Sequence, residues 1–235
     1  MMADYDFYYW PLPFRGQFIR AILAFAGKSW SEQDSDAISD LIGQNPRDQP
    51  IPFMGPPVLI ERATGFALSQ MPAIAVYLGD TLSLVDDRAT SRALAAKVAN
   101  DANDVIDELT LDGGREMWTA EKWKEFEPRL RKWMHIWESL GTHHALKAEA
   151  GYLLGTKEPG IADILTATLW STMGQRFPVI QALLDHTAPK VAGLVERMRK
   201  IPSLAELERG SFEKYGDGYC GGEIEKSLRA VLKDR

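Results

Sequence analysis

Cysteine is almost absent from this sequence. Cys220 is the single cysteine among 235 residues. An internal disulfide needs two cysteines and a cysteine-rich zinc site needs several, so both are excluded. Redox catalysis by a pair of cysteines separated by two residues is disfavoured for the same reason. Cys220 stands in a glycine-rich, flexible-looking stretch near the C-terminal end, and we expect its thiol to be inert.

Long apolar runs and an excess of positive charge are also missing. No stretch of 18 uncharged apolar residues occurs, which excludes a membrane-spanning helix. Lys and Arg number 27 against 33 Asp and Glu, a formal net charge of −6. This balance argues against nucleic acid as a partner, because phosphate neutralisation dominates such binding. Residues 1–14 lack the basic start of a secretory signal. We expect a cytoplasmic protein that binds neither nucleic acid nor membranes.

The first eighty residues mix strand and helix signals. Aromatic residues crowd positions 4–10, as in a buried strand, and Pro11 and Pro13 end that strand. Apolar residues then follow a helical spacing up to Gly27, which stands where a C-terminal cap would. The other expected elements are a strand at 28–33, a short helix at 37–42, a hairpin of 57–61 with 66–68, and a helix from Pro72. The expected order is βαβ, a long connection and ββα.

After Gly79 the strand signals nearly vanish. Residues 80–90 have the composition of a linker, and the apolar residues beyond them fall at helical spacing, as Leu130, Trp133 and Trp137 do. A change from mixed α/β to all-α marks a domain boundary. The sequence therefore predicts an α/β domain at 1–83 and an all-helical domain at 91–235.

Four short segments together carry a resemblance to a known family. In chain order they are Tyr9-Trp10-Pro11 with Gly16-Gln17-Phe18-Ile19-Arg20; Gly55-Pro56-Pro57-Val58-Leu59; Gln70-Met71-Pro72-Ala73-Ile74 with Tyr77-Leu78-Gly79; and Gly155 with Ile161-Ala162-Asp163. Over nearly its full length the chain resembles the cytosolic glutathione transferases, in particular tyrosine-type members of the Pi, Mu and Sigma kind. The resemblance implies a thioredoxin-like domain that binds glutathione, followed by a helical domain that lines the site of the electrophile.

The resemblance also implies a reaction, the conjugation of glutathione to a small apolar electrophile. The thiol of glutathione is a poor nucleophile while protonated, and a hydroxyl donor aimed at the sulfur stabilises the thiolate. Tyr9 is the candidate donor, since it ends the first strand just before the proline-containing loop. Tyr5 and Tyr8 are its competitors, and Tyr9 could instead be one more core aromatic. Between Trp10 and Gln17 there is no Ser or Cys, which disfavours the serine-type and cysteine-type members.

Four residues would bind glutathione within the first domain. Pro57 resembles the family's cis-proline, which would present the N–H and C=O of Val58 to the cysteinyl part like an added strand; an ordinary proline at a strand start is the alternative. Gln70 and Met71 stand at a helix N-terminus, whose free N–H groups suit the γ-glutamyl carboxylate. Met71 replaces the family's usual serine, so only its backbone N–H can bind. Gln70 could instead simply face solvent.

Two aspartates of the helical domain have different expected roles. Asp104 matches an acidic residue that reaches glutathione across the dimer in Pi-like members, so the resemblance implies a homodimer. The alternative is a solvated helix face, because Asp101 and Asp107 flank Asp104 at helical spacing. Asp163 resembles the aspartate of the family's helix-capping motif, with Gly160 where Ser or Thr is usual, and its expected role is structural.

Several functional alternatives stay open at this stage. His143 and His144 lack a third ligand at metal spacing, so no metal is expected and glutathione is the one cosubstrate implied. Detoxifying conjugation competes with an isomerase or peroxidase reaction at the same site. A non-catalytic scaffold of the same fold is the third reading, and Met71 is the residue that keeps it open. Met117 and Trp118 border the electrophile pocket or belong to the core.

Overall fold

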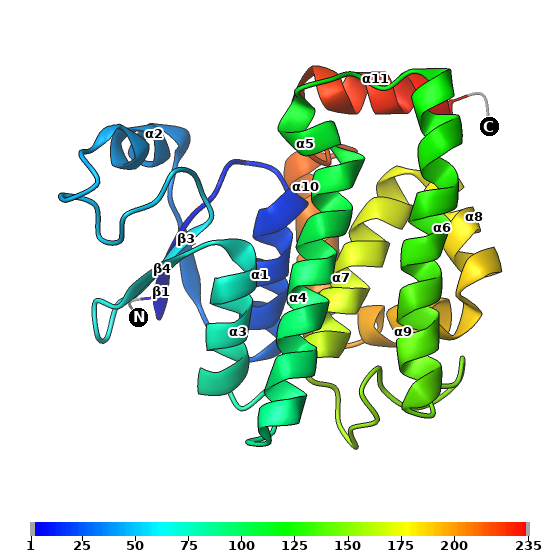
Figure 1. Cartoon of the computed structure of the whole chain (residues 1–235). Coiled ribbons are helices and arrows are strands. Elements are labelled where there is room, and N and C mark those ends of the chain that lie inside the picture. The colour runs from blue at the N-terminus through cyan, green and yellow to red at the C-terminus, as the bar shows by residue number, and fades with distance from the viewer. Residues whose placement is uncertain (1–2, 234–235) are drawn as a thin grey trace.

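The structure is a computed structural model that describes residues 3–233. Its N-terminal part holds a four-stranded sheet in the order β2-β1-β3-β4, with helices on both sides (Figure 1). Strand β1 pairs with β2 in parallel and with β3 antiparallel, and β3 pairs antiparallel with β4. A mixed sheet of this kind confirms the expected α/β fold of the N-terminal region.

The order of elements in this part is the βαβ, connection, ββα order that the sequence predicts. The elements are β1 (Tyr5–Tyr8), α1 (Phe14–Phe25), β2 (Trp30–Glu32), α2 (Ser35–Gly43), β3 (Val58–Glu61), β4 (Ala67–Ser69) and α3 (Met71–Thr81). Several boundaries shift by one or two residues, and the shift that bears on the site is the end of β1, which is at Tyr8 and not at Trp10. The last residue pair of the β1–β3 ladder is Tyr8 with Val58, after which the chain turns away through Pro11 and Pro13.

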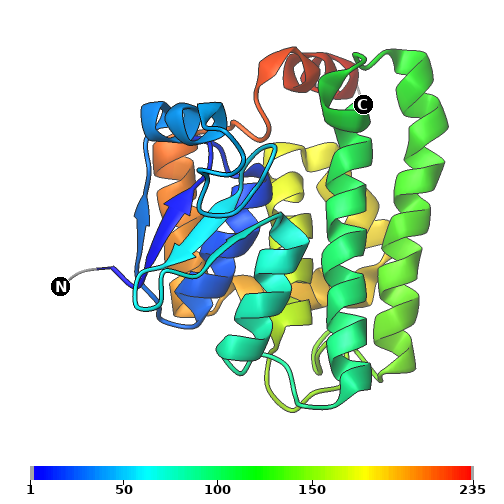
Figure 2. The same ribbon diagram turned by 60° about the vertical axis from the view of Figure 1, so that its left-hand side comes forward.

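The remaining regular elements of the described chain are helices. They are α4 (Ala89–Leu109), α5 (Leu111–Gly114), α6 (Ala120–His143), α7 (Ile161–Arg176), α8 (Pro178–Thr187), α9 (Pro189–Arg199), α10 (Pro202–Tyr215) and α11 (Gly222–Leu232). Figure 1 shows α11 lying across the ends of α5 and α6, and Figure 2 shows α1 and α3 between the sheet and helices α4 and α7. Across residues 3–233, none of the helices is both long and apolar enough to span a membrane.

Helix α7 lies at the centre of the helical part and is buried along almost its whole length. It packs against α1, α4, α8 and α9, so it joins the sheet-containing part to the helical part. Most of the buried apolar residues form one cluster that runs from Phe7 in β1 to Trp170 in α7 and beyond. The helical C-terminal region is therefore confirmed, while the exact division at 1–83 and 91–235 stays a prediction.

Asp163 starts α7 in the way that the sequence predicts. Its side chain is buried, Oδ2 accepts from the backbone N–H of Gly160 at 2.9 Å, and Oδ1 accepts from that of Leu153 at 2.7 Å. Burial raises the pKa of this carboxyl to about 6, although the backbone hydrogen bonds act in the opposite direction. Asp163 thus satisfies one free N–H of the helix N-terminus and ties the preceding loop to it.

Candidate functional site

Tyr9 lies one residue beyond β1, at the entrance to the loop that leads into α1. Its side chain is 4% exposed, and its ring stacks on Phe7 with centroids 6.1 Å apart and an interplanar angle of 10°. The hydroxyl oxygen accepts a hydrogen bond from the backbone N–H of Arg15 at 3.1 Å. The strand-end packing therefore fixes the ring, and the first turn of α1 fixes the hydroxyl.

Gly16 allows this close approach of α1 to Tyr9. A Cβ atom at Gly16 would lie 2.3 Å from Cδ1 of Tyr9, far inside van der Waals contact. Any larger residue at this position would have to displace the tyrosine ring. The glycine of the sequence motif is therefore a packing requirement for the Tyr9–Arg15 hydrogen bond.

The surroundings of Tyr9 keep its hydroxyl protonated. Burial raises the pKa of Tyr9 to about 12, against the opposing effects of Arg15 and Arg20 and of backbone N–H groups. At neutral pH the group is therefore a hydroxyl, which can accept one hydrogen bond and donate another. The hydroxyl oxygen of Tyr9 already accepts a hydrogen bond from Arg15, so the hydroxyl proton is free to be donated to a different acceptor. An anion would be the favoured acceptor, because hydrogen bonds to charged groups are stronger.

The competing tyrosines do not reach this loop. Tyr5 lies at the other end of β1, where it pairs with Glu61 of β3. Tyr8 is half-buried on the neighbouring position of the strand, and burial and the nearby Asp6 raise its pKa. Of the three candidates, Tyr9 alone has a hydroxyl that is bonded to the start of α1 in the described chain.

Arg15 is a site residue that the sequence reasoning missed. Its guanidinium donates from Nε to Oδ1 of Asn103 at 3.1 Å and from Nη2 to Oδ1 of Asp107 at 3.1 Å. Both partners lie on α4, so Arg15 connects the first turn of α1, which orients Tyr9, to the helical part. The available signal was a basic residue directly before Gly16 in an otherwise apolar loop.

The peptide bond between Pro56 and Pro57 is cis, as the resemblance implies. It directly precedes β3, whose first residue, Val58, is fully buried. Val58 is paired on both sides, with Tyr8 of β1 and with Ser69 of β4. Its backbone therefore has no free sheet edge, and a ligand could approach the strand only at its end, beside the cis bond.

Gln70 and Met71 begin α3 in an unusual conformation. Gln70 has φ of 73° and ψ of 121°, backbone angles that residues other than glycine rarely adopt. Such strained backbone conformations are often found at functional sites. Met71 is 1% exposed, with its side chain in the core. The side chain at 71 therefore supports the fold, and only its backbone is available to a ligand.

A groove of about 630 Å³ lies between α3 and α4, next to Gln70. Asn100 and Asn103 line its α4 side, and Tyr77 lines its α3 side. Asn103 is also the residue that accepts from Arg15. The groove at the start of α3 is therefore linked through one side chain to the loop that holds Tyr9.

Asp104 does not line this groove. It is exposed on α4, and partial burial together with Asp101, Glu108 and Asp107 raises its pKa. Within one chain, Asp104 is therefore not brought together with Tyr9, Gln70 and Met71. Its predicted contact with glutathione requires a second subunit and stays a prediction.

The other candidates are assigned by burial and geometry. Within residues 3–233 no group of three or more His, Cys, Asp and Glu side chains could hold a metal ion. Trp118 is buried and donates from Nε1 to the carbonyl of Leu109 at 2.9 Å, so it belongs to the core. Met117 is 38% exposed.

Comparisons with known proteins agree with this arrangement. A sequence profile of the family described as the C-terminal domain of glutathione S-transferase matches residues 94–231, more than half of the chain. Curated protein sequences gave no match. Similar solved structures are NaGST-2 (24% identity, TM-score 0.70), monomeric Na-GST-3 from the hookworm Necator americanus (20%, 0.70) and a Nu-class GST from Haemonchus contortus (22%, 0.68).

Each of these three alignments covers 88% of this chain and 97% of the other. At such identities the structural likeness shows the fold, and the sequence profile shows the family. The mixed sheet, the cis bond before β3 and the helical C-terminal part are consistent with both findings. The chain belongs to the glutathione S-transferase family of enzymes.

Proposed function

We propose that the chain is a tyrosine-type glutathione transferase in which Tyr9 stabilises the thiolate of glutathione. The observation that carries the proposal is the hydroxyl of Tyr9, which is buried, protonated at neutral pH and bonded through its oxygen to the N–H of Arg15. Such a hydroxyl has a proton to donate. Donation to the sulfur favours the charged form of the thiol and lowers its pKa.

Glutathione would extend from Tyr9 toward the start of α3. Its γ-glutamyl carboxylate would meet the backbone N–H of Met71 at the N-terminus of an eleven-residue helix, beside Gln70. Its cysteinyl part would lie along the cis Pro56–Pro57 bond at the start of β3, next to Val58. The groove between α3 and α4 supports this placement, because Gln70 and Asn103 both line it.

The reaction we assign is nucleophilic conjugation. The thiolate attacks an electrophilic carbon of an apolar substrate, a C–S bond forms, and the leaving group departs with the electron pair of the broken bond. Tyr9 loses no proton in this step; it holds one toward the sulfur and keeps more of the thiol ionised. The electrophile would lie in the cleft between the two parts of the chain, beyond the loop of Tyr9.

Assembly, class and cellular role belong to the same proposal. A homodimer would bring Asp104 of one subunit toward the glutathione of the other. The family resemblance further implies a Pi-like, Mu-like or Sigma-like class. It also implies a cytoplasmic, detoxifying role. One similar protein, Na-GST-3, is described as monomeric, so the oligomeric state is worth measuring first by sedimentation.

Titration calorimetry with glutathione, followed by a conjugation assay with a reactive aryl halide, tests the proposal. We expect binding between micromolar and low millimolar concentration, and conjugation that requires Tyr9. Binding without conjugation of any electrophile would favour an isomerase or peroxidase reaction. Absence of binding at ten millimolar glutathione would contradict the proposal and favour the non-catalytic scaffold.

A further inference from the structure

The segment between α10 and α11 is fixed to the protein along its backbone. We call residues 217–221 the C-terminal strap. The buried carboxylate of Glu225 accepts through Oε2 from three consecutive backbone N–H groups, those of Tyr219 at 2.9 Å, Cys220 at 2.9 Å and Gly221 at 2.6 Å. Although burial acts against it, these bonds hold the pKa of Glu225 below its ordinary value, so the anion persists.

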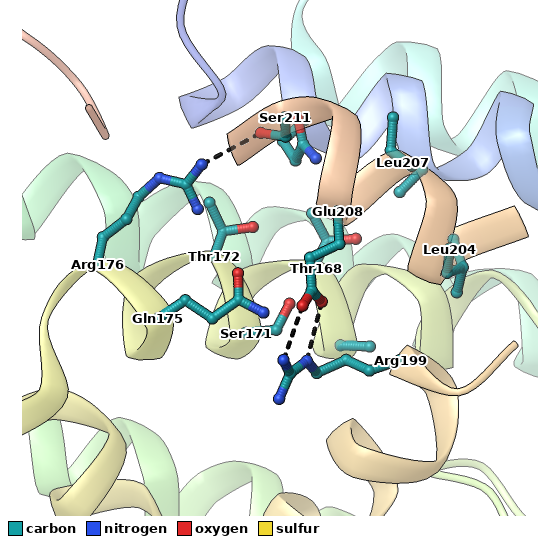
Figure 3. A pocket seen from close by; sticks show the side chains of 13 residues that line it. Thr168, Ser171, Thr172, Gln175, Arg176, Arg199, Leu204, Leu207, Glu208 and Ser211 are labelled. Atoms are coloured by element: carbon teal, nitrogen blue, oxygen red, sulfur yellow. Dashed lines mark hydrogen bonds and ion pairs between the residues drawn. The ribbon is translucent and has the colours of Figure 1, made fainter. Parts of the chain in front are cut away.

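Two arginines hold the other half of the C-terminal strap. Arg176, 5% exposed at the end of α7, donates from Nε to the carbonyl of Gly218 at 2.7 Å. The same guanidinium donates from Nη2 to the hydroxyl of Ser211 at 3.1 Å (Figure 3). Arg229 of α11 donates to the carbonyl of Asp217 and pairs with the second oxygen of Glu225 at 2.7 Å.

The C-terminal strap packs on the loop that follows Tyr9. Tyr219 is 2% exposed, and its ring makes an edge-to-face contact with Phe14, with centroids 5.3 Å apart. A Cβ atom at Gly221, whose φ is 74°, would lie 3.3 Å from Cδ1 of Leu12. Leu12 lies in the loop and Phe14 is the first residue of α1, so the strap contacts both the loop and the helix start that follows it.

These contacts lie next to the hydrogen bond that orients Tyr9. Phe14 is the residue before Arg15, whose backbone N–H donates to the Tyr9 hydroxyl. We infer that the C-terminal strap, with Tyr219 as a positioning residue and Glu225 as its anchor, holds the loop where Arg15 can orient the hydroxyl of Tyr9 toward glutathione. The inference rests on the proposed function and adds a distant segment to the machinery of that site.

Two further observations agree with the inference. Burial raises the pKa of Tyr219 well above its ordinary value, Cys220 and Tyr9 add to this, and Arg15 opposes it, so the strap and the site share one electrostatic environment. The N–H of Leu12 donates to the carbonyl of Trp10 at 2.7 Å, and Arg20 donates to the carbonyl of Leu12 at 2.8 Å, while Pro11 and Pro13 have no N–H to donate. Apolar contact from the strap adds to the order that these bonds give the loop.

The single cysteine of the chain offers a direct probe of the C-terminal strap. Cys220 is partly buried, and burial raises the pKa of its thiol to about 12, so the closed strap should react slowly with a neutral thiol reagent. Glu225→Gln removes the charge that binds three N–H groups and Arg229. The charge of Glu225 also helps to raise the pKa of this thiol. We therefore expect Cys220 to react at least about tenfold faster both in Glu225→Gln and in Tyr219→Ala, which keeps that charge, because the strap opens more often in each.

The functional readout is the pKa of enzyme-bound glutathione, followed by the ultraviolet absorbance of its thiolate. Glu225→Gln and Tyr219→Ala should each raise that pKa by about one unit and lower kcat about tenfold, with a smaller change in KM. Tyr219→Phe keeps the ring and should behave as the unchanged protein does. Glu208→Gln is the matched control, because it weakens a similar pair, Glu208 with Arg199 at 2.7 Å, away from the loop (Figure 3).

The outcomes separate this inference from the proposed function. If the unchanged protein does not lower the pKa of bound glutathione, the proposed function fails. If it does, but the strap variants leave that pKa unaltered, the inference alone is overturned. The inference also fails if Cys220 reacts no faster in Glu225→Gln, or if Tyr219→Phe and Glu208→Gln raise the thiol pKa as much as the strap variants do.

Discussion

The backbone N–H of Arg15 donates to the hydroxyl oxygen of Tyr9 at 3.1 Å, across the loop that joins β1 to α1. This bond occupies one lone pair of the hydroxyl, so the tyrosine proton points away from the N–H of Arg15. The side chain of Arg15 is tied to Asn103 and Asp107 of α4. The orientation of Tyr9 therefore depends on how the sheet and the helical part are packed together.

Because Gly16 packs closely against Tyr9, adding a single methyl group at position 16 should strongly affect both turnover and stability. In Gly16→Ala the new Cβ would overlap the tyrosine ring, so the ring or the helix start must move. We expect turnover to fall at least about tenfold and the free energy of unfolding to fall by about 1–3 kcal/mol. Conjugation kinetics and urea unfolding would measure the two effects.

Gly210→Ala is the control for this change. Gly210 lies inside α10 with no atom within 4 Å of an added Cβ. Its replacement by alanine should leave turnover unaltered and stabilise the protein by up to about 1 kcal/mol. Equal turnover in Gly16→Ala and the unchanged protein would contradict the role given to the glycine.

Replacing Met71 by the family's usual serine should lower the stability of the protein and should not increase its affinity for glutathione. Its side chain is almost fully buried, so Met71→Ser leaves a cavity and a hydroxyl in the core. By analogy with other large-to-small core changes, we expect unfolding to become easier by about 2–5 kcal/mol. Calorimetry of glutathione binding and urea unfolding would check both statements.

Met54→Ser provides the comparison, since Met54 is 90% exposed and its replacement should leave stability nearly unchanged. A clear tightening of glutathione binding in Met71→Ser would show that the side chain at 71 can reach the ligand. That result would be contrary to its placement in the core.

Because the carboxyl of Asp163 is buried, the difference in stability between the unchanged protein and Asp163→Ala should depend on pH. Asp163→Ala leaves the N–H groups of Leu153 and Gly160 without their acceptor, which should cost about 1–3 kcal/mol for each buried group. The folded pKa of Asp163, about 6, lies above the ordinary value of 3.8. The folded state therefore binds the proton more tightly than the unfolded state does.

It follows that the contribution of Asp163 is fully present below about pH 4 and declines as the pH rises through about 6. The difference in unfolding free energy between the unchanged protein and Asp163→Ala should shrink over that interval. Denaturant unfolding at several pH values would measure it. A difference that grows from pH 4 to pH 6 would contradict the sign of the shift.

Regular patterns made much of the fold predictable. Helical spacing of apolar residues placed α1, α3 and α6, and the aromatic run and the hairpin signal placed β1, β3 and β4. The cis bond at Pro56–Pro57, which the family resemblance implied, is also confirmed. The helices and strands depend on local chemistry, which the sequence displays directly.

The missed features depend on contacts between distant residues. The stretch around Tyr219 looked flexible because of its glycines, but Glu225, Arg176 and Arg229 fix its backbone. The burial of the Met71 side chain follows from the direction in which α3 starts. Neither the partners of these backbone groups nor that direction is visible in a periodic pattern.

The most direct test of the account is the pKa of enzyme-bound glutathione in the unchanged protein and in Tyr9→Phe. Loss of a hydrogen bond to an anion costs about 1.5–3 kcal/mol. We therefore expect the thiol pKa to rise by about one to two units, with glutathione affinity at low pH and the stacking on Phe7 retained. Tyr5→Phe, at the opposite end of β1, should leave it unaltered. An equally low thiol pKa in Tyr9→Phe would contradict the assignment of Tyr9.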